Sequence, residues 1–218
     1  MLKLKNILFD EYVNYIFEGN QKFNLTGFKT KKDIYEHLIT DTVNSLLFLS
    51  DEFFDVHKII DVGSGNGVPG IVLAILYPNF FVTLVESNKK KSNFLIEVIK
   101  KLKLPNVDVI CSRAEHLNSD MYTEKFDLGI SRAVGSIAIM NELLCRYIKL
   151  NKYILHLKSL NYDNELNEAN NCLNALGLKL LSKHIISTSP KFNVNILFQK
   201  IKKTDSKFPR NWKEIKNK

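Results

Sequence analysis

Apolar residues recur at two different spacings along this chain of 218 residues, and the change of spacing divides it. Over residues 4–20 and about 31–49 they return every three or four positions, which predicts two amphipathic helices. From residue 58 onward, short apolar runs alternate with further helical patterns, as is typical of a parallel sheet with helices on both faces. The pattern therefore predicts an N-terminal helical cap over residues 1–50 and an α/β domain over residues 51–203.

Seven strands are expected in the α/β domain. Five of them alternate with helices and are predicted at residues 58–62, 80–86, 107–111, 126–130 and 153–158. The helices are predicted at residues 69–77, 88–103, 136–150 and 162–176. Only a short turn separates the last two strands, 178–186 and 193–201, so they are expected to pair as an antiparallel hairpin that closes the sheet.

A glycine-rich turn follows the first strand. The strand carries Asp61, and Gly63, Gly65 and Gly67 come next at alternate positions, before Pro69 and a new helical pattern. Glycine is needed where the backbone takes a positive φ or where a ligand approaches it closely. Proline suits the first turn of a helix, and the free N–H groups at that helix end bind anionic or dipolar groups. The turn therefore predicts a binding site for a cofactor.

The second strand ends at Glu86, 23 residues after Gly63, where nucleotide-binding α/β units place a carboxylate for the ribose. A dinucleotide and S-adenosylmethionine both fit this arrangement. Dinucleotide-binding turns have the spacing G-x-G-x-x-G and usually lack a preceding acid, whereas Asp61 here would suit the cationic ammonium of a methionine. A seven-stranded sheet with an antiparallel last strand also favours a Rossmann-like class I S-adenosylmethionine-dependent methyltransferase. A turn without a ligand would need no such pair of acids.

The ends of the third and fourth strands are expected to complete this site, because ligands of open α/β sheets bind at the carboxyl ends of the strands. Ala114 and Glu115 follow the third strand, where a backbone N–H and a carboxylate would meet the edge of an adenine. Ser131, Arg132 and Ala133 follow the fourth strand.

The residues after the fourth strand indicate the reaction. They lack the Asn/Asp-Pro-Pro-aromatic run typical of methyltransferases that act on exocyclic amines. Cys111 and Cys145 are interpreted as core thiols and not as nucleophiles, and the five histidines show no metal-binding spacing. The absence of an obvious base suits an acceptor with a free lone pair, such as guanine N7, which needs orientation and no deprotonation.

Charge is concentrated at the C-terminus. The chain carries a net charge of +8, and residues 200–218 hold eight basic and two acidic residues, with Phe208 and Trp212 between them. A basic tail over residues 204–218 with interleaved aromatic residues is what a nucleic acid would select, although a solvated terminus explains the charge about equally well. We expect Lys207, Arg210 and Lys213 in this tail to contact RNA.

The remaining composition indicates a soluble cytoplasmic protein. No apolar run approaches the ~18 residues of a membrane span, and the N-terminus has no secretory pattern. Three scattered cysteines suit a reducing compartment. No pattern in the sequence indicates a dimer, so a monomer without membrane or metal partners is expected.

Several short motifs, taken in order, resemble one family. They are Asn24-Leu25-Thr26, the stretch from Asp61 to Gly70, Glu86-Ser87, Arg113-Ala114-Glu115, Ser131-Arg132-Ala133, Lys158 and Phe208-Pro209-Arg210. Nearly the whole chain resembles the bacterial small-subunit rRNA guanine-N7 methyltransferases (the glucose-inhibited division protein B family). That family usually has His-x-x-Asp-Ser on its second helix. In this chain three residues, and not two, separate Asp41 from His37. Many members also have Gly after the lysine of the fifth strand, where this chain has Ser159.

The resemblance implies an enzyme that uses S-adenosylmethionine to methylate N7 of guanine 527 in the 530 loop of 16S rRNA, as free RNA or in the small ribosomal subunit. From the residues and the resemblance together, the expected cofactor contacts are Asp61, Gly63, Gly65, Gly67, Val68, Glu86, Ala114, Glu115 and Arg132. Arg132 is also the expected catalytic residue, since it would orient the guanine, and Lys158 is a further expected RNA contact. Two alternatives stay open: an inactive RNA-binding ribosome-assembly factor on the same fold, and a methyltransferase for a small metabolite.

Overall fold

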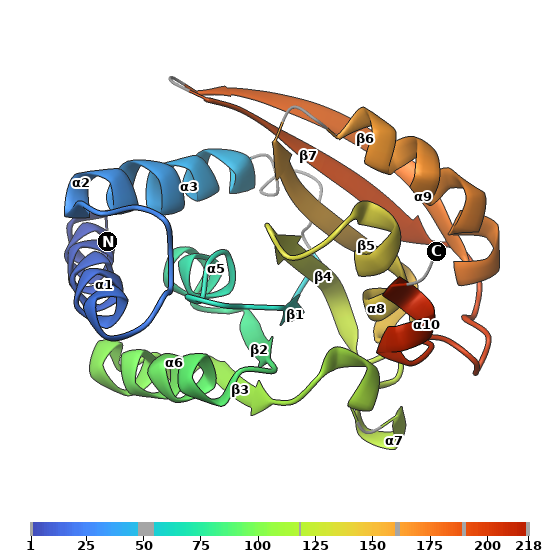
Figure 1. The fold of residues 1–218 in the computed structure, drawn as a ribbon, viewed down its shortest axis with the longest axis horizontal. Helices are drawn as coiled ribbons and strands as arrows, with labels where there is room; N and C mark the ends of the chain where they lie inside the picture. The colour runs from blue at the N-terminus through green and yellow to red at the C-terminus, as the bar shows by residue number, and fades with distance from the viewer. Residues whose placement is uncertain (1, 48–54, 118, 160–161, 189–190, 217–218) are drawn as a thin grey trace.

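A mixed sheet of seven strands forms the centre of the protein, seen here in a computed structural model that describes residues 2–47, 55–117, 119–159, 162–188 and 191–216 (Figure 1). The strand order is β3-β2-β1-β4-β5-β7-β6. The pairings among β1, β2, β3, β4 and β5 are parallel, and β7 runs antiparallel to both of its neighbours, β5 and β6, which confirms the predicted class I arrangement. The strands are β1 Lys58–Val62, β2 Phe81–Glu86, β3 Val107–Cys111, β4 Phe126–Arg132, β5 Ile148–Ser159, β6 Leu178–Thr188 and β7 Lys191–Lys200.

Helices cover both faces of the sheet and enclose two apolar cores (Figure 1). Successive residues of a strand point to opposite faces, so Ile59 enters one core and Ile60 the other. The first core lies against α1 Leu2–Lys22, α2 Lys31–Ile34, α3 Asp41–Leu46, α5 Gly70–Leu76 and α6 Lys89–Leu102. The second lies against α8 Ile137–Cys145, α9 Asp163–Leu176 and α10 Trp212–Lys216. Among the described helices, none is long and apolar enough to cross a membrane.

The second helix of the cap is not the continuous α-helix that its periodicity predicts. A π-helical turn, η1 Tyr35–Thr40, separates α2 from α3, and residues 48–50 lie outside the described part of the chain. The wider turn leaves the carbonyl groups of His37 and Leu38 accepting hydrogen bonds from Arg132 on β4. A tertiary contact therefore accompanies this irregularity, and π-turns are often found at functional sites.

Two further elements differ from the pattern. The helix predicted to reach residue 150 ends at Cys145, and β5 already begins at Ile148. The pattern did not separate them because a buried apolar run has the same appearance in a helix and in a strand.

The C-terminal segment of residues 204–216 is not a free tail. Its Phe208 and Ile215 are buried in the second core, so this segment packs against the α/β domain.

Candidate active site

The glycine turn has the predicted conformation. Gly63, Gly65 and Gly67 all adopt positive φ angles, of 75°, 56° and 96°. The N–H of Gly63 donates to the carbonyl of Val85 over 2.8 Å, which holds the turn against β2. A Cβ placed on Gly65 would meet no heavy atom closer than the carbonyl oxygen of Gly63 at 3.7 Å. The space in front of Gly65 is therefore open to a ligand, and a larger residue would fill it.

Asp61 lies behind this turn. It is fully buried, and its Oδ2 accepts a hydrogen bond of 3.0 Å from the N–H of Gly70 at the start of α5. Its Oδ1 has no partner among the described atoms. Burial raises the pKa of Asp61 to about 7; the bond from Gly70 opposes this rise, and the charge of Glu86 adds to it. An unpaired buried carboxylate oxygen beside the turn fits the predicted attraction for a cationic methionine group.

Glu86 shapes the turn from the neighbouring strand. Its Oε2 accepts from the N–H of Gly65 over 2.8 Å, and its Oε1 accepts from the N–H of Asn88 over 2.7 Å. Each carboxylate oxygen keeps a second lone pair, which is what a ribose hydroxyl would use. The turn and Glu86 thus fit S-adenosylmethionine on the observed geometry.

A small cavity of about 90 Å³ continues from the turn toward the predicted adenine end. Glu115 is buried there, and its Oε1 accepts from Nε of Arg113 over 2.8 Å. The carbonyl of Ala114 accepts from the hydroxyl of Tyr147, so this segment is fixed to the core. The lining residues are Val62, Gly63, Val85, Ser87, Ser112, Arg113, Ala114, Glu115, Val134, Leu143 and Trp212. Val68, which was also predicted to contact the cofactor, is buried and lies outside this lining.

A second cavity of about 410 Å³ opens at the carboxyl ends of β4 and β5, against α3. Charged side chains of both signs face it. Val134 lines both cavities, so they share a wall. The residues of the second cavity are Asp41, Ser45, Arg132, Ala133, Val134, Gly135, Leu157, Lys158, Ser159, Glu165 and Asn193. Asp41, Ser45 and Glu165 were not predicted as site residues, because their nearness to Arg132 arises only in the folded chain.

Arg132 joins the sheet to the cap. Its guanidinium donates to the carbonyls of His37 and Leu38 and to the hydroxyl of Thr42. These bonds use three of its five N–H donors, and its Nε–H is not among the three. Burial lowers the pKa of Arg132, and nearby Asp41 opposes that shift. Arg132 therefore lies in the wall of the second cavity and holds the π-turn in place.

Asp41 has a second neighbour in the cap. Its Oδ2 lies 3.8 Å from Nδ1 of His37, and both side chains are mostly buried. The ring of His37 in turn stacks on Phe28, with centroids 4.8 Å apart. Within the described ranges, no group of His, Cys, Asp and Glu side chains has the arrangement of a metal site.

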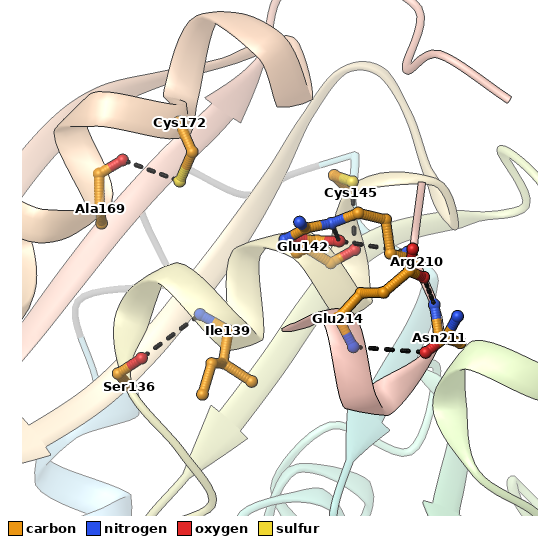
Figure 2. A network of polar contacts seen from close by, with 9 residues as sticks. All are labelled: Ser136, Ile139, Glu142, Cys145, Ala169, Cys172, Arg210, Asn211 and Glu214. Carbon is orange, nitrogen blue, oxygen red and sulfur yellow. Dashed lines mark hydrogen bonds and ion pairs between the residues drawn. The ribbon is translucent and has the colours of Figure 1, made fainter. Parts of the chain in front are cut away.

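The four predicted RNA contacts occupy three different settings. Nζ of Lys158 donates to the carbonyl of Gly135 and to Glu165, each over 2.6 Å, inside the second cavity. Arg210 forms a two-pronged ion pair with Glu142 of α8 over 2.7 and 2.6 Å, as Figure 2 shows. Lys207 and Lys213 are exposed, and Nζ of Lys207 lies 3.6 Å from Oδ2 of Asp205.

Solved structures share this architecture. M. jannaschii TYW2 in complex with AdoMet aligns with a TM-score of 0.56 at 20% identity, over 75% of this chain and 76% of that chain. MtNAS in complex with MTA and tNA aligns with a TM-score of 0.61 at 16% identity, over 91% of this chain and 76% of that chain. With the sheet order and the glycine turn, these likenesses define a Rossmann-like class I methyltransferase fold.

Sequence comparison identifies the family. Residues 5–194 match the family profile described as rRNA small subunit methyltransferase G. A ribosomal RNA small subunit methyltransferase G from Mesoplasma florum is 38% identical over 207 residues, which cover 94% of this chain and 86% of that protein. One from Mycoplasmoides gallisepticum is 39% identical with the same coverage. The chain belongs to the rRNA small subunit methyltransferase G family, and its cofactor is S-adenosylmethionine.

Proposed function

We propose that this protein transfers the methyl group of S-adenosylmethionine to N7 of guanine 527 in the 530 loop of 16S rRNA. The names of its relatives support a small-subunit rRNA substrate, and the cytoplasm is where that substrate is made. The choice of N7 rests on the motif resemblance and on the chemistry that follows from the residues of the second cavity.

One observation carries the proposal: the two cavities meet at Val134. Methyl transfer needs the donor carbon and the acceptor atom in line and in contact. The cavity of about 410 Å³ is within the size range of small-molecule sites, and it is large enough to receive a base turned out of its loop. A base held there would lie beside the cofactor, with Val134 in the wall that the two cavities share.

The residues of the second cavity match the edges of a guanine. Guanine presents N–H donors on its Watson–Crick edge, which the carboxylates of Asp41 and Glu165 can accept. Guanine O6 is an acceptor that the Nε–H of Arg132 can meet. The N7 lone pair must stay free of any donor so that it can attack the methyl group. In this proposal Arg132 therefore orients the base through O6, and S-adenosylmethionine supplies the electrophilic methyl group.

The RNA backbone would follow the basic surface beyond this cavity. Lys158 lies in the cavity, and Lys207 and Lys213 are exposed on the C-terminal segment, where they can contact phosphates. Arg210 is held by Glu142, so a phosphate contact would compete with that ion pair. We assign Arg210 mainly to fixing the C-terminal segment on which the two exposed lysines lie.

The test is transfer of a radiolabelled methyl group to small-subunit RNA from a strain that lacks this protein, followed by mapping of the modified nucleotide. We expect the label at N7 of guanine 527 and at no other nucleotide. RNA binding without transfer would instead favour the inactive assembly factor. Transfer that does not depend on RNA would favour a small-metabolite methyltransferase. Label on another nucleotide would overturn the choice of guanine 527.

A further inference from the structure

We propose that Trp212 belongs to the cofactor site and that its indole forms the outer wall of the adenine end. This residue lines the small cavity together with Gly63 and Glu115, although it lies about 100 positions further along the chain than Glu115. The proposal depends on the use of S-adenosylmethionine and is independent of which acceptor is methylated.

A chain of contacts links Trp212 to the strand end that faces the adenine. The guanidinium carbon of Arg113 lies 4.3 Å from the centroid of the indole, in a cation–π contact. Nε of the same arginine donates to Glu115, whose side chain is buried. The indole, the guanidinium and the carboxylate thus form one side of the cavity. Trp212 as a residue remains 37% exposed, so part of its surface is left for a second planar ring to cover.

The C-terminal segment is built to hold Trp212 at this place. Arg210, two residues before it, is clamped by Glu142 of α8, and Ile215, three residues after it, is buried in the second core. Asn211 and Glu214 exchange side-chain-to-backbone hydrogen bonds of 3.3 Å that cap α10, as Figure 2 shows. The indole is therefore fixed from both sides along the chain, which favours a role in binding over that of a loose surface residue.

An indole beside an adenine would contribute stacking. Substitution of a stacking aromatic residue by alanine typically weakens binding of a base by about tenfold or more. The C-terminal segment would then have two partners: the cofactor through Trp212 and the RNA backbone through Lys207 and Lys213. Binding of S-adenosylmethionine would stabilise the segment on α8, and release of the cofactor would loosen it.

Intrinsic fluorescence tests this assignment directly, because Trp212 is the single tryptophan of the chain. The full-length protein is titrated with S-adenosylhomocysteine, and its emission is followed. We expect a saturable change whose midpoint agrees with the dissociation constant measured by calorimetry. Adenosine should produce the same type of change, whereas methionine should not, since the indole lies at the adenine end.

Variants provide the second measurement. Trp212→Ala should bind S-adenosylhomocysteine about tenfold more weakly by calorimetry, and Trp212→Phe should restore most of the affinity. Lys216→Ala, on the same short helix and exposed, is the matched control and should bind as the wild type does. Melting temperatures of all variants establish that they fold. Emission unchanged at saturating ligand, or wild-type affinity in a folded Trp212→Ala protein, would overturn the assignment.

Arg210→Ala tests whether the ion pair between Arg210 and Glu142 holds Trp212 in the cavity wall. It leaves the indole intact and removes the clamp on Glu142, so it should weaken cofactor binding in the same direction as Trp212→Ala. It should also shift the emission of the free protein toward that of a solvated indole. Cofactor affinity and emission both unchanged in Arg210→Ala would contradict the proposed fixing of Trp212.

Discussion

The hydroxyl of Tyr12 on α1 donates a hydrogen bond of 2.7 Å to the carbonyl of Asn66 in the glycine turn. A Cβ on Gly67 would lie 2.7 Å from the same hydroxyl oxygen, so Tyr12 and a side chain at that position could not coexist. Tyr12 is completely buried, and its pKa is raised well above the usual value, so it stays a neutral donor. The N-terminal cap therefore helps to hold the glycine turn.

Tyr12→Phe removes this hydrogen bond and keeps the packing. We expect the free energy of unfolding to fall by about 1 kcal/mol and the affinity for S-adenosylhomocysteine to fall with it, since the turn loses one of its restraints. Urea unfolding and calorimetry measure the two effects. Tyr77 lies at the C-terminal end of α5, whereas the glycine turn precedes the N-terminal end. Tyr77→Phe is therefore the control and should leave the affinity unchanged. A Tyr12→Phe protein with wild-type affinity would show that the cap does not influence the turn.

Gly65→Val should abolish the rise in melting temperature that S-adenosylhomocysteine produces. The added side chain occupies the open space before the turn, at a φ of 56° that valine tolerates poorly. Gly65→Asn separates these two causes, because asparagine accepts a left-handed φ and still fills the space. Gly27→Val is a control in a loop where a Cβ would meet no heavy atom within 4 Å. A full thermal shift in folded Gly65→Asn would refute the proposed position of the cofactor.

Asp61→Asn should expose a steep dependence of stability on pH. The pKa of Asp61 is raised from 3.8 to about 7 in the folded protein. The unfolded chain therefore ionises first as the pH rises through this range, and the free energy of unfolding falls. Burial lowers the pKa of His156 from 6.5 to about 3, so its contribution is lost as the pH falls from 6.5 toward 3. The two opposite slopes, each up to about 1.4 kcal/mol per pH unit, largely cancel between about pH 4 and 6.5 in the wild type.

Without the carboxylic acid at position 61, the slope from His156 is no longer opposed by that from Asp61. The unfolding free energy of Asp61→Asn should then fall, relative to the wild type, by about 1.4 kcal/mol for each unit of acidification. Urea unfolding at several pH values between 4.5 and 6.5 measures the difference. Parallel curves for the two proteins would mean that Asp61 is already ionised at these pH values.

Arg132→Lys should lose methyl transfer by about 100-fold even when RNA and cofactor are saturating. A lysine cannot donate to the carbonyls of His37 and Leu38 and still reach into the cavity, so the cavity wall and a base bound there would shift. Single-turnover assays measure the loss. Thr42→Val removes only one of the three partners of Arg132 and should cost much less. Normal turnover by Arg132→Lys would exclude a part for the guanidinium in positioning the base.

Lys207→Ala combined with Lys213→Ala should weaken RNA binding and flatten its dependence on salt. Each lost phosphate contact lowers the slope of log K against log salt by about 0.7 to 0.9, so the double variant should lose about 1.4 to 1.8 units of slope. Filter binding over a salt series measures the slope. The affinity for S-adenosylhomocysteine should not change, in contrast to Arg210→Ala. An unchanged slope would show that these exposed lysines lie outside the RNA surface.

Local patterns in the sequence determined much of this fold. The acid–glycine turn after β1, the carboxylate that ends β2 and the antiparallel hairpin of β6 and β7 were all predicted from neighbouring residues. These features are encoded locally because a strand, a tight turn and a helix start each depend on the residues within a few positions. The alternation of strands and helices then restricts a chain of this length to few topologies, which is why the sheet was predicted as well.

Tertiary structure decided the partners of the charged residues. Arg132 reaches backbone carbonyls 94 and 95 positions away, and Arg210 reaches Glu142 across 68 positions. It also decided the π-turn before Asp41 and the place of Trp212 in the same cavity wall as Gly63 of the glycine turn. Periodicity records which face of an element is buried, but it contains no information about which distant residue will lie opposite. The chemical setting of each arginine and of Trp212 therefore became visible only when the cap, the sheet and the C-terminal segment were packed together.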